Sequence, residues 1–186
     1  MNQAGSQSSW IIRFYEGVVP DDRGRSLQQI WRWSDEKLER VHDYIQWLFP
    51  LPEPSSFNPE APTLDQQAIR EFRARAELRA NMRSSFMRML VFYGFKLIEE
   101  DPLRVVPSES FIERSRNWLR LSNHNHLRIT RILRSLRLVG LEEEAVALSR
   151  CLAALSEKES SSPEPRISEE TFGYWRAAAG VEGLAE

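Results

Sequence analysis

Apolar residues recur at helical spacing through most of the chain, and this pattern constrains the fold more than any other feature. Over residues 38–48 and 141–155 the apolar positions step by three or four residues, as on one face of a helix. Ser26 and Thr63 each stand three residues before a glutamine, which is the pattern of a helix-capping box. No segment alternates convincingly between apolar and polar residues as a strand would. The sequence therefore predicts an all-α fold, a compact single domain of about seven helices with no substantial sheet.

Composition divides the chain into four parts. Residues 1–9 are small and polar, so we expect a disordered leader. The helical domain is expected over residues 10–155, with an extended or irregular start, and residues 156–167 have the Ser, Glu and Pro content of a linker. Residues 168–186 are expected to form a short, loosely attached C-terminal helix and a tail.

The helix predicted over residues 38–48 ends at Pro50, which cannot continue it. On this helix His42 lies on the flank of the apolar stripe, beside other polar side chains. One interpretation is a solvated or hydrogen-bonding edge; the other is a titratable group in a partly buried cleft, able to transfer a proton. Trp47 and Phe49 are expected to be structural anchors of the turn that follows.

A second polar group of residues opens the helix predicted after residue 122. Asn125 precedes the apolar face, His126 falls at its edge, and His124 projects to the opposite side. At a helix start the two imidazoles point about 200° apart, so we predict no metal site. Arginines recur every three residues in this helix, and this spacing indicates mainly a solvated face: Arg128, Arg131, Arg134 and Arg137.

Composition also excludes several classes of function. The net charge of −2 gives no general attraction to nucleic acid or anionic lipid, and no nucleic-acid motif is present. Cys151 is the single cysteine, which excludes an intramolecular disulfide and fits a reducing, cytoplasmic compartment. No stretch is long and apolar enough to be a transmembrane segment. No GxSxG, P-loop, GxGxxG or HExxH motif occurs, and we predict no cofactor.

Three segments carry a resemblance to a known family. HDYIQWLFPLPEP from His42, VFYGF from Val91 and NHNHLRITRILRSL from Asn123 occur in this order along the chain. Together they closely resemble the conserved region of the opioid growth factor receptor family, over roughly residues 14–155. His126 departs from the family pattern, and the chain lacks the repeat-bearing C-terminal extension and basic nuclear-localisation stretches of the animal proteins.

The resemblance implies a receptor-like domain that is unrelated to seven-helix receptors. In animals this domain is associated with binding an enkephalin peptide and restraining growth. The resemblance also implies that peripheral association with a membrane is possible. We therefore predict a ligand-binding domain for a small peptide or a small aromatic or anionic ligand. The predicted ligand-binding residues are His42, Gln46, Trp47, Tyr93, His124, Asn125, Arg128 and Arg131. Two alternatives stay open: a small acid/base enzyme that uses His42 and His124, and a non-catalytic interaction scaffold.

Overall fold

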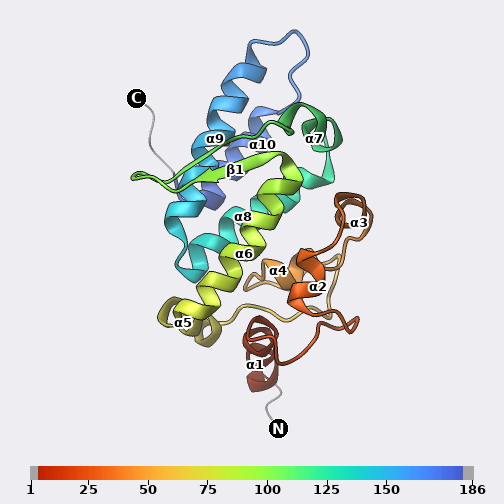
Figure 1. Ribbon diagram of the computed structural model, residues 1–186, viewed down its shortest axis with the longest axis vertical. Coiled ribbons are helices and arrows are strands. Elements are labelled where there is room, and N and C mark those ends of the chain that lie inside the picture. Colours follow the sequence, from red (N-terminus) through yellow and green to blue (C-terminus); the bar gives the residue numbers. More distant parts are fainter. Residues whose placement is uncertain (1–3, 182–186) are drawn as a thin grey trace. The chain divides into compact units, whose positions relative to one another are not determined.

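A computed structural model describes residues 4–181, with side chains from Trp10 onward, and shows a mostly helical protein (Figure 1). The prediction of a mainly helical fold is confirmed, and the described residues form ten helices and one two-stranded sheet. They fall into two compact units. Unit 1 comprises the chain up to Arg88 together with residues 138–140, and unit 2 comprises residues 89–137 and the chain from Leu141 onward.

Unit 1 is built around short helices. Its elements are α1 (Ala4–Tyr15), α2 (Leu27–Trp31), α3 (Asp35–Arg40), α4 (Ile45–Leu48), α5 (Gln66–Ala74) and the first part of α6 (Ala76–Tyr93). Buried aromatic rings from three of these helices meet edge to face: Phe14 contacts Trp47 at 5.1 Å between ring centroids, and Tyr15 contacts Phe72 at 5.0 Å. The Tyr15 hydroxyl also donates a hydrogen bond to the carbonyl of Leu48. These contacts hold α1, α4 and α5 in one core.

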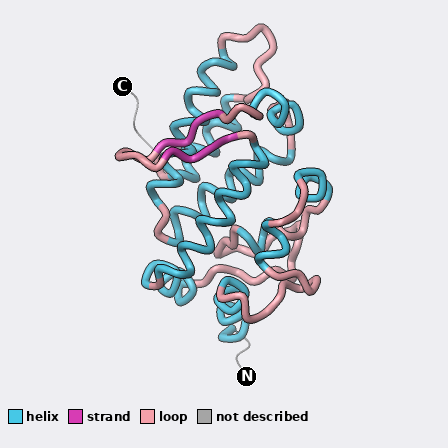
Figure 2. The backbone as a smooth tube through the Cα atoms, viewed as in Figure 1, coloured by secondary structure: helices cyan, strands magenta, loops and turns pink. Residues whose placement is uncertain are grey.

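Unit 2 contains the longer helices and the sheet. Its elements are the end of α6, β1 (Phe95–Ile98), β2 (Arg104–Pro107), α7 (Phe111–Trp118), α8 (His124–Val139) as far as Arg137, α9 (Glu142–Ser160) and α10 (Glu169–Ala179). The two strands pair antiparallel, with Phe95 opposite Pro107 (Figure 2). Trp118 lies at the centre of the core, where its ring contacts Tyr93 and Phe95. α9 packs against α10 and β2.

Several predicted helix ends agree with the structure. Ser26 and Gln29 form the complete capping box of α2, and Ser34 and Ser168 cap α3 and α10 with their side chains. α5 and α6 are separated at Arg75, which takes an extended conformation with φ −109° and ψ 112°. The predicted cap at Thr63 is wrong, because the Asp65 side chain caps α5 instead and accepts a hydrogen bond from the backbone N–H of Ala68 at 2.8 Å.

The single helix predicted over residues 38–48 is wrong, because α3 and α4 are separate. Val41 takes an extended conformation, with φ −90° and ψ 134°. The Asp43 carboxylate then pairs with Arg25 at 2.7 Å, and the Asp43 carbonyl accepts a hydrogen bond from the Asn58 amide at 3.0 Å. A continuous helix would move the Asp43 carboxylate and carbonyl away from these partners. Both short helices still bury their apolar residues.

The ends of the chain and the sheet also differ from expectation. α1 begins at Ala4 and continues to Tyr15, so the first part of the predicted domain is helical and not extended; residues 1–3 of the predicted leader lie outside the described residues. α9 continues to Ser160, inside the predicted linker. The small sheet was missed because each strand has only four residues, too few for a clear alternation.

The bounds of the C-terminal helix agree with the sequence, but its loose attachment does not. α10 ends at Gly180, which takes the left-handed conformation expected of a helix C-cap. Trp175, in the middle of this helix, is fully buried in unit 2. α10 is therefore part of the core of this unit.

Candidate functional site

The start of α8 gathers polar side chains of the third segment that carries the family resemblance, and two of them, Asn125 and His126, are buried in unit 2. The side-chain oxygen of Asn123 accepts a hydrogen bond from the backbone N–H of Asn125 at 2.9 Å, which satisfies one free donor of the first turn. Ser122 precedes it with a positive φ of 56°, so the chain turns sharply into the helix. This turn directs Asn125 and His126 into the core.

Asn125 and Arg128 form a buried polar pair on α8. The Arg128 guanidinium donates to the side-chain oxygen of Asn125 at 3.2 Å, and only 5% of Arg128 is exposed. The two residues lie three apart, so one helical turn brings their side chains together. The predicted solvated face is therefore wrong at Arg128, and the other three arginines of the series are also partly buried.

His126 is the most unusual group of this region. Its ring lies edge to face with those of Trp118 at 6.4 Å and Trp175 at 5.3 Å, and only 5% of the residue is exposed. Neither ring nitrogen makes a hydrogen bond of normal geometry within the described part of the chain, although the Trp118 carbonyl lies close enough to act on the imidazole. Burial lowers the pKa of His126, the charge of His124 lowers it further, and the Trp118 carbonyl opposes both effects. The imidazole is therefore neutral near pH 7 and keeps one donor and one acceptor.

A pocket of 360 Å³ opens beside this imidazole. Its walls come from α8, with His124, His126 and Thr130, and from α10, with Thr171 and Tyr174. The volume lies at the lower end of the range of small-molecule sites. Imidazole, hydroxyl and phenol groups line the pocket, so it can hydrogen-bond a small polar group while aromatic rings pack around that group.

Tyr93 is a core residue of unit 2 and does not line this pocket. Its ring contacts Phe92 at 5.0 Å and Trp118 at 5.4 Å, and its carbonyl accepts a hydrogen bond from the Trp118 indole at 3.0 Å. These contacts fix the end of α6 against α7. They give Tyr93 a positioning role for Trp118, which in turn touches His126.

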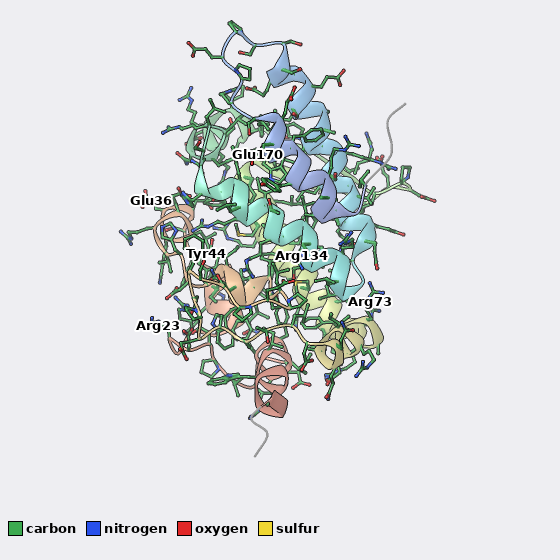
Figure 3. All side chains as sticks on the ribbon, turned by 180° about the vertical axis from the view of Figure 1, so that it is seen from behind. Arg23, Glu36, Tyr44, Arg73, Arg134 and Glu170 are labelled. Atoms are coloured by element: carbon green, nitrogen blue, oxygen red, sulfur yellow. The ribbon has the colours of Figure 1, made fainter. Side chains whose placement is uncertain are left out.

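The predicted site residues of the first segment lie in unit 1. His42 is exposed in the stretch between α3 and α4, and Figure 3 labels Tyr44, which ends this stretch. Gln46 is 4% exposed, and its amide nitrogen donates to Ser55 at 3.4 Å, whereas its side-chain oxygen makes no hydrogen bond to the described residues. The Trp47 indole N–H is likewise buried without an acceptor among them. Two adjacent residues of α4 thus bury unsatisfied polar atoms.

The fold therefore brings the predicted residues together in two sets. His124, Asn125, Arg128 and Arg131 share α8, and only His124 of these lines the pocket. Gln46 and Trp47 share α4, whereas His42 lies outside any helix. The sequence indicated none of the other residues that line the pocket, among them His126, Thr171 and Tyr174. Thr171 and Tyr174 lie more than forty residues after His126 in the chain. The one signal for them is the neighbouring Trp175, whose indole donates a hydrogen bond to the His126 carbonyl.

Two further properties bear on the kind of protein. None of the described helices combines the length and the apolar character that crossing a bilayer requires. Within residues 4–181, no three His, Cys, Asp or Glu side chains gather in a way that could hold a metal ion.

Comparisons with known proteins agree with the resemblance seen in the sequence. The profile of the opioid growth factor receptor (OGFr) conserved region matches residues 5–181. The rat opioid growth factor receptor is 40% identical over 124 residues, and the mouse opioid growth factor receptor-like protein 1 is 37% identical over 141 residues. These matches cover 67% and 70% of this chain but only 21% and 28% of the two relatives. No solved structure matches the chain. With nearly all of its described residues inside the conserved region, the chain belongs to the opioid growth factor receptor family.

Proposed function

We propose that this chain is a receptor-type ligand-binding domain, and that its ligand enters the pocket at the start of α8. The observation that carries the proposal is the His126 imidazole, which is buried beside this pocket and makes no hydrogen bond of normal geometry within the described residues. A buried polar group left without a partner costs about 1–3 kcal/mol. A ligand that supplies a donor or an acceptor to this ring recovers that free energy on binding.

The chemistry of the walls favours a ligand with both polar and aromatic parts. Thr130, Thr171 and Tyr174 offer hydroxyl groups, and His124 offers a second imidazole. The rat relative is named as a receptor for a growth factor, and this supports a short peptide as the ligand. A small aromatic or anionic molecule would meet the same groups. We place the binding event in the cytoplasm, since the lone Cys151 is free and partly exposed.

The remaining predicted residues enter the proposal with distinct roles. Asn125 and Arg128 hold the first turn of α8 in place, and Arg131 lies one turn further along the same helix. Tyr93 positions Trp118 behind His126. In unit 1, the buried side-chain oxygen of Gln46 and the indole N–H of Trp47 are a second pair of groups for a ligand or an ordered water to satisfy, and His42 is exposed near them in sequence.

Proton magnetic resonance tests the proposal directly, because the chain has only three histidines and their ring signals can be assigned by substitution. The probe is a panel of tetra- and pentapeptides that carry an aromatic residue and a free carboxylate. We expect at least one peptide to shift the ring signals of His126 and His124 in a saturable way. Thr130→Val and Tyr174→Ala, both on the pocket wall, should weaken that binding by roughly fivefold or more, the equivalent of one hydrogen bond.

Arg116→Ala is the matched control, since Arg116 is exposed on α7 and lies outside the pocket. Binding that is equally strong in the two wall variants, or the absence of any saturable shift in the folded parent protein, would overturn the proposal. The alternative of acid/base catalysis by His42 and His124 predicts in addition that a probe is consumed with turnover, and that His124→Ala abolishes this.

A further inference from the structure

A second hollow of 600 Å³ lies in unit 2, between the hairpin and α9. In Figure 1 the hairpin crosses α9, and Figure 2 shows its two strands as adjacent magenta tubes; β2 packs against this helix. We call this hollow the hairpin groove; β1, β2, α7 and α9 all contribute to its walls. It shares no lining residue with the pocket at the start of α8.

The floor of the hairpin groove is apolar, and it exists because α9 turns small side chains toward it. Ala147, Cys151 and Ala154 recur at four- and three-residue spacing, so they occupy one face of the helix. Their short side chains leave space opposite the larger Val105 and Phe111 of the facing wall. An apolar surface of this kind gains free energy when a ligand displaces water from it.

The rim of the hairpin groove is basic. Of its fourteen lining residues three are basic, Arg104, Arg150 and Lys158, and none is acidic. No acidic residue stands three or four positions from Arg150 or Lys158 in the sequence, so neither cation has an ion-pair partner on its own face of α9. Arg104 pairs with Glu100 at 2.6 Å, but both side chains are more than half exposed. The rim therefore presents a positive charge that the groove itself does not neutralise.

We propose that the hairpin groove binds an amphipathic carboxylate of the fatty-acid class. The alkyl chain lies on the apolar floor along α9, and the carboxylate is held at the rim by the cations. Arg150 and Lys158 are eight residues apart, which corresponds to about 12 Å along the helix axis. An extended chain can therefore follow the floor between them while its one charged end meets either cation.

The lining favours an alkyl chain over a peptide strand. A peptide would bury backbone N–H and C=O groups, and each such group needs a hydrogen-bond partner. The side chains that line the groove offer only the three cations and one thiol for this purpose. An alkyl chain needs no such partner, and its single carboxylate needs only the charge that the rim supplies.

The single cysteine provides a direct readout of occupancy. Cys151 lies on the floor of the hairpin groove and is partly exposed. Burial raises the pKa of its thiol to about 12, so a disulfide reagent will modify it slowly near neutral pH. The experiment measures the rate of this modification on the whole chain as decanoate is added, together with the melting temperature. We expect decanoate to slow labelling in a saturable way and to raise the melting temperature.

Three comparisons make the outcome specific. Decanol and decyltrimethylammonium carry the same alkyl chain without the negative charge, and both should protect Cys151 about fivefold more weakly, which is the upper end of what an exposed ion pair contributes. Arg150→Gln with Lys158→Gln should weaken decanoate binding by about fivefold, through loss of the exposed ion pair, whereas Arg116→Gln, which removes an exposed cation outside the groove, should leave it unchanged. Ala154→Phe, at an exposed helix position, should fill the groove and abolish binding without unfolding the chain.

Equal protection of Cys151 by decanol and decanoate would mean that the groove is a nonspecific apolar surface, and it would overturn the proposal. Unchanged decanoate binding in the variant that carries both Arg150→Gln and Lys158→Gln would overturn it too. Protection by acidic peptides in preference to decanoate would show that the occupant is a peptide. Thr130→Val and Tyr174→Ala should leave decanoate binding intact, so a failure here and a failure of the proposed receptor function can be told apart.

Discussion

The indole nitrogen of Trp175 donates a hydrogen bond of 3.1 Å to the backbone carbonyl of His126, 49 residues earlier in the chain. The two rings also meet edge to face at 5.3 Å. The indole thus satisfies its only donor inside the core while its ring covers one side of the imidazole. The last helix therefore helps to form the environment of the residue on which the proposed binding site depends.

Trp175→Ala should lower the free energy of unfolding by about 3–5 kcal/mol, as loss of a fully buried large aromatic side chain does. Tyr174→Ala removes an aromatic ring from the exposed neighbouring position. This variant should change the free energy of unfolding by less than about 1 kcal/mol. Urea denaturation followed by far-ultraviolet circular dichroism measures both. Similar losses in the two variants would mean that α10 does not contribute to the core.

His126 should make stability depend on pH just below neutrality. Its pKa in the folded chain is lowered from 6.5, so as the pH falls below that value the unfolded chain takes up a proton that the folded chain does not. The free energy of unfolding should therefore be at its full value above about pH 7 and decline toward pH 5.5. In His126→Phe this part of the decline should disappear, while any contribution of His42 and His124 remains.

Denaturant titrations at several pH values between those limits give the comparison. The carboxylates with lowered pKa values, among them Glu77, Glu109 and Glu159, lose their stabilising charge only at lower pH, so they do not enter this window. An identical slope in the parent protein and in His126→Phe would contradict the buried, neutral state of the ring.

Phe49 and Phe57 offer a matched pair at the two sides of the proline-rich turn. Phe49 is fully buried in unit 1, whereas Phe57 is 75% exposed. Phe49→Ala should cost about 3–5 kcal/mol of stability, and Phe57→Ala less than about 0.5 kcal/mol. Thermal melting of the two variants next to the parent protein tests whether the turn is anchored by the first ring alone.

Two glycine-to-alanine substitutions should act in opposite directions. Gly140 has φ +89°, and an added Cβ would lie 3.2 Å from the Cγ atom of Arg73, so Gly140→Ala should destabilise by roughly 1–2 kcal/mol. Gly173 lies in the middle of α10 with no atom within 4 Å of an added Cβ. Gly173→Ala should stabilise by roughly 0.5–1 kcal/mol, because alanine loses less conformational entropy in a helix. Denaturant midpoints with unchanged slopes provide the measurement; a loss of stability in Gly173→Ala would contradict this reasoning.

Much of the fold could be predicted because its helices are marked locally. Capping residues such as Ser26 and Ser168 act on backbone groups two or three positions away, so a short stretch of sequence is enough to recognise them. The break between α3 and α4 could not be predicted in the same way. It depends on Arg25 and Asn58, which reach Asp43 from 18 and 15 residues away. The hairpin could not be predicted either, because strands of four residues form through hydrogen bonding between β1 and β2 and show no clear alternation of apolar and polar residues.

The candidate site shows the same division. The sequence identified the polar character of the first turn of α8, but the three-residue spacing of its arginines indicated solvent exposure, and Arg128 is buried. Burial of a guanidinium becomes acceptable only when a partner such as Asn125 is buried with it, and helical spacing alone does not reveal that. His126 was not among the predicted ligand-binding residues, yet the rings of Trp118 on α7 and Trp175 on α10 surround it and it lines the pocket.

The course of the chain between the two units has a consequence for how this domain can be inherited. The chain passes from unit 1 to unit 2 within α6, returns for residues 138–140 at the end of α8, and leaves again at Leu141. No single cut therefore separates one unit from the other, and a gene rearrangement that moved either unit alone would divide a helix. The part of the chain that matches the family, residues 5–181, accordingly takes in both units.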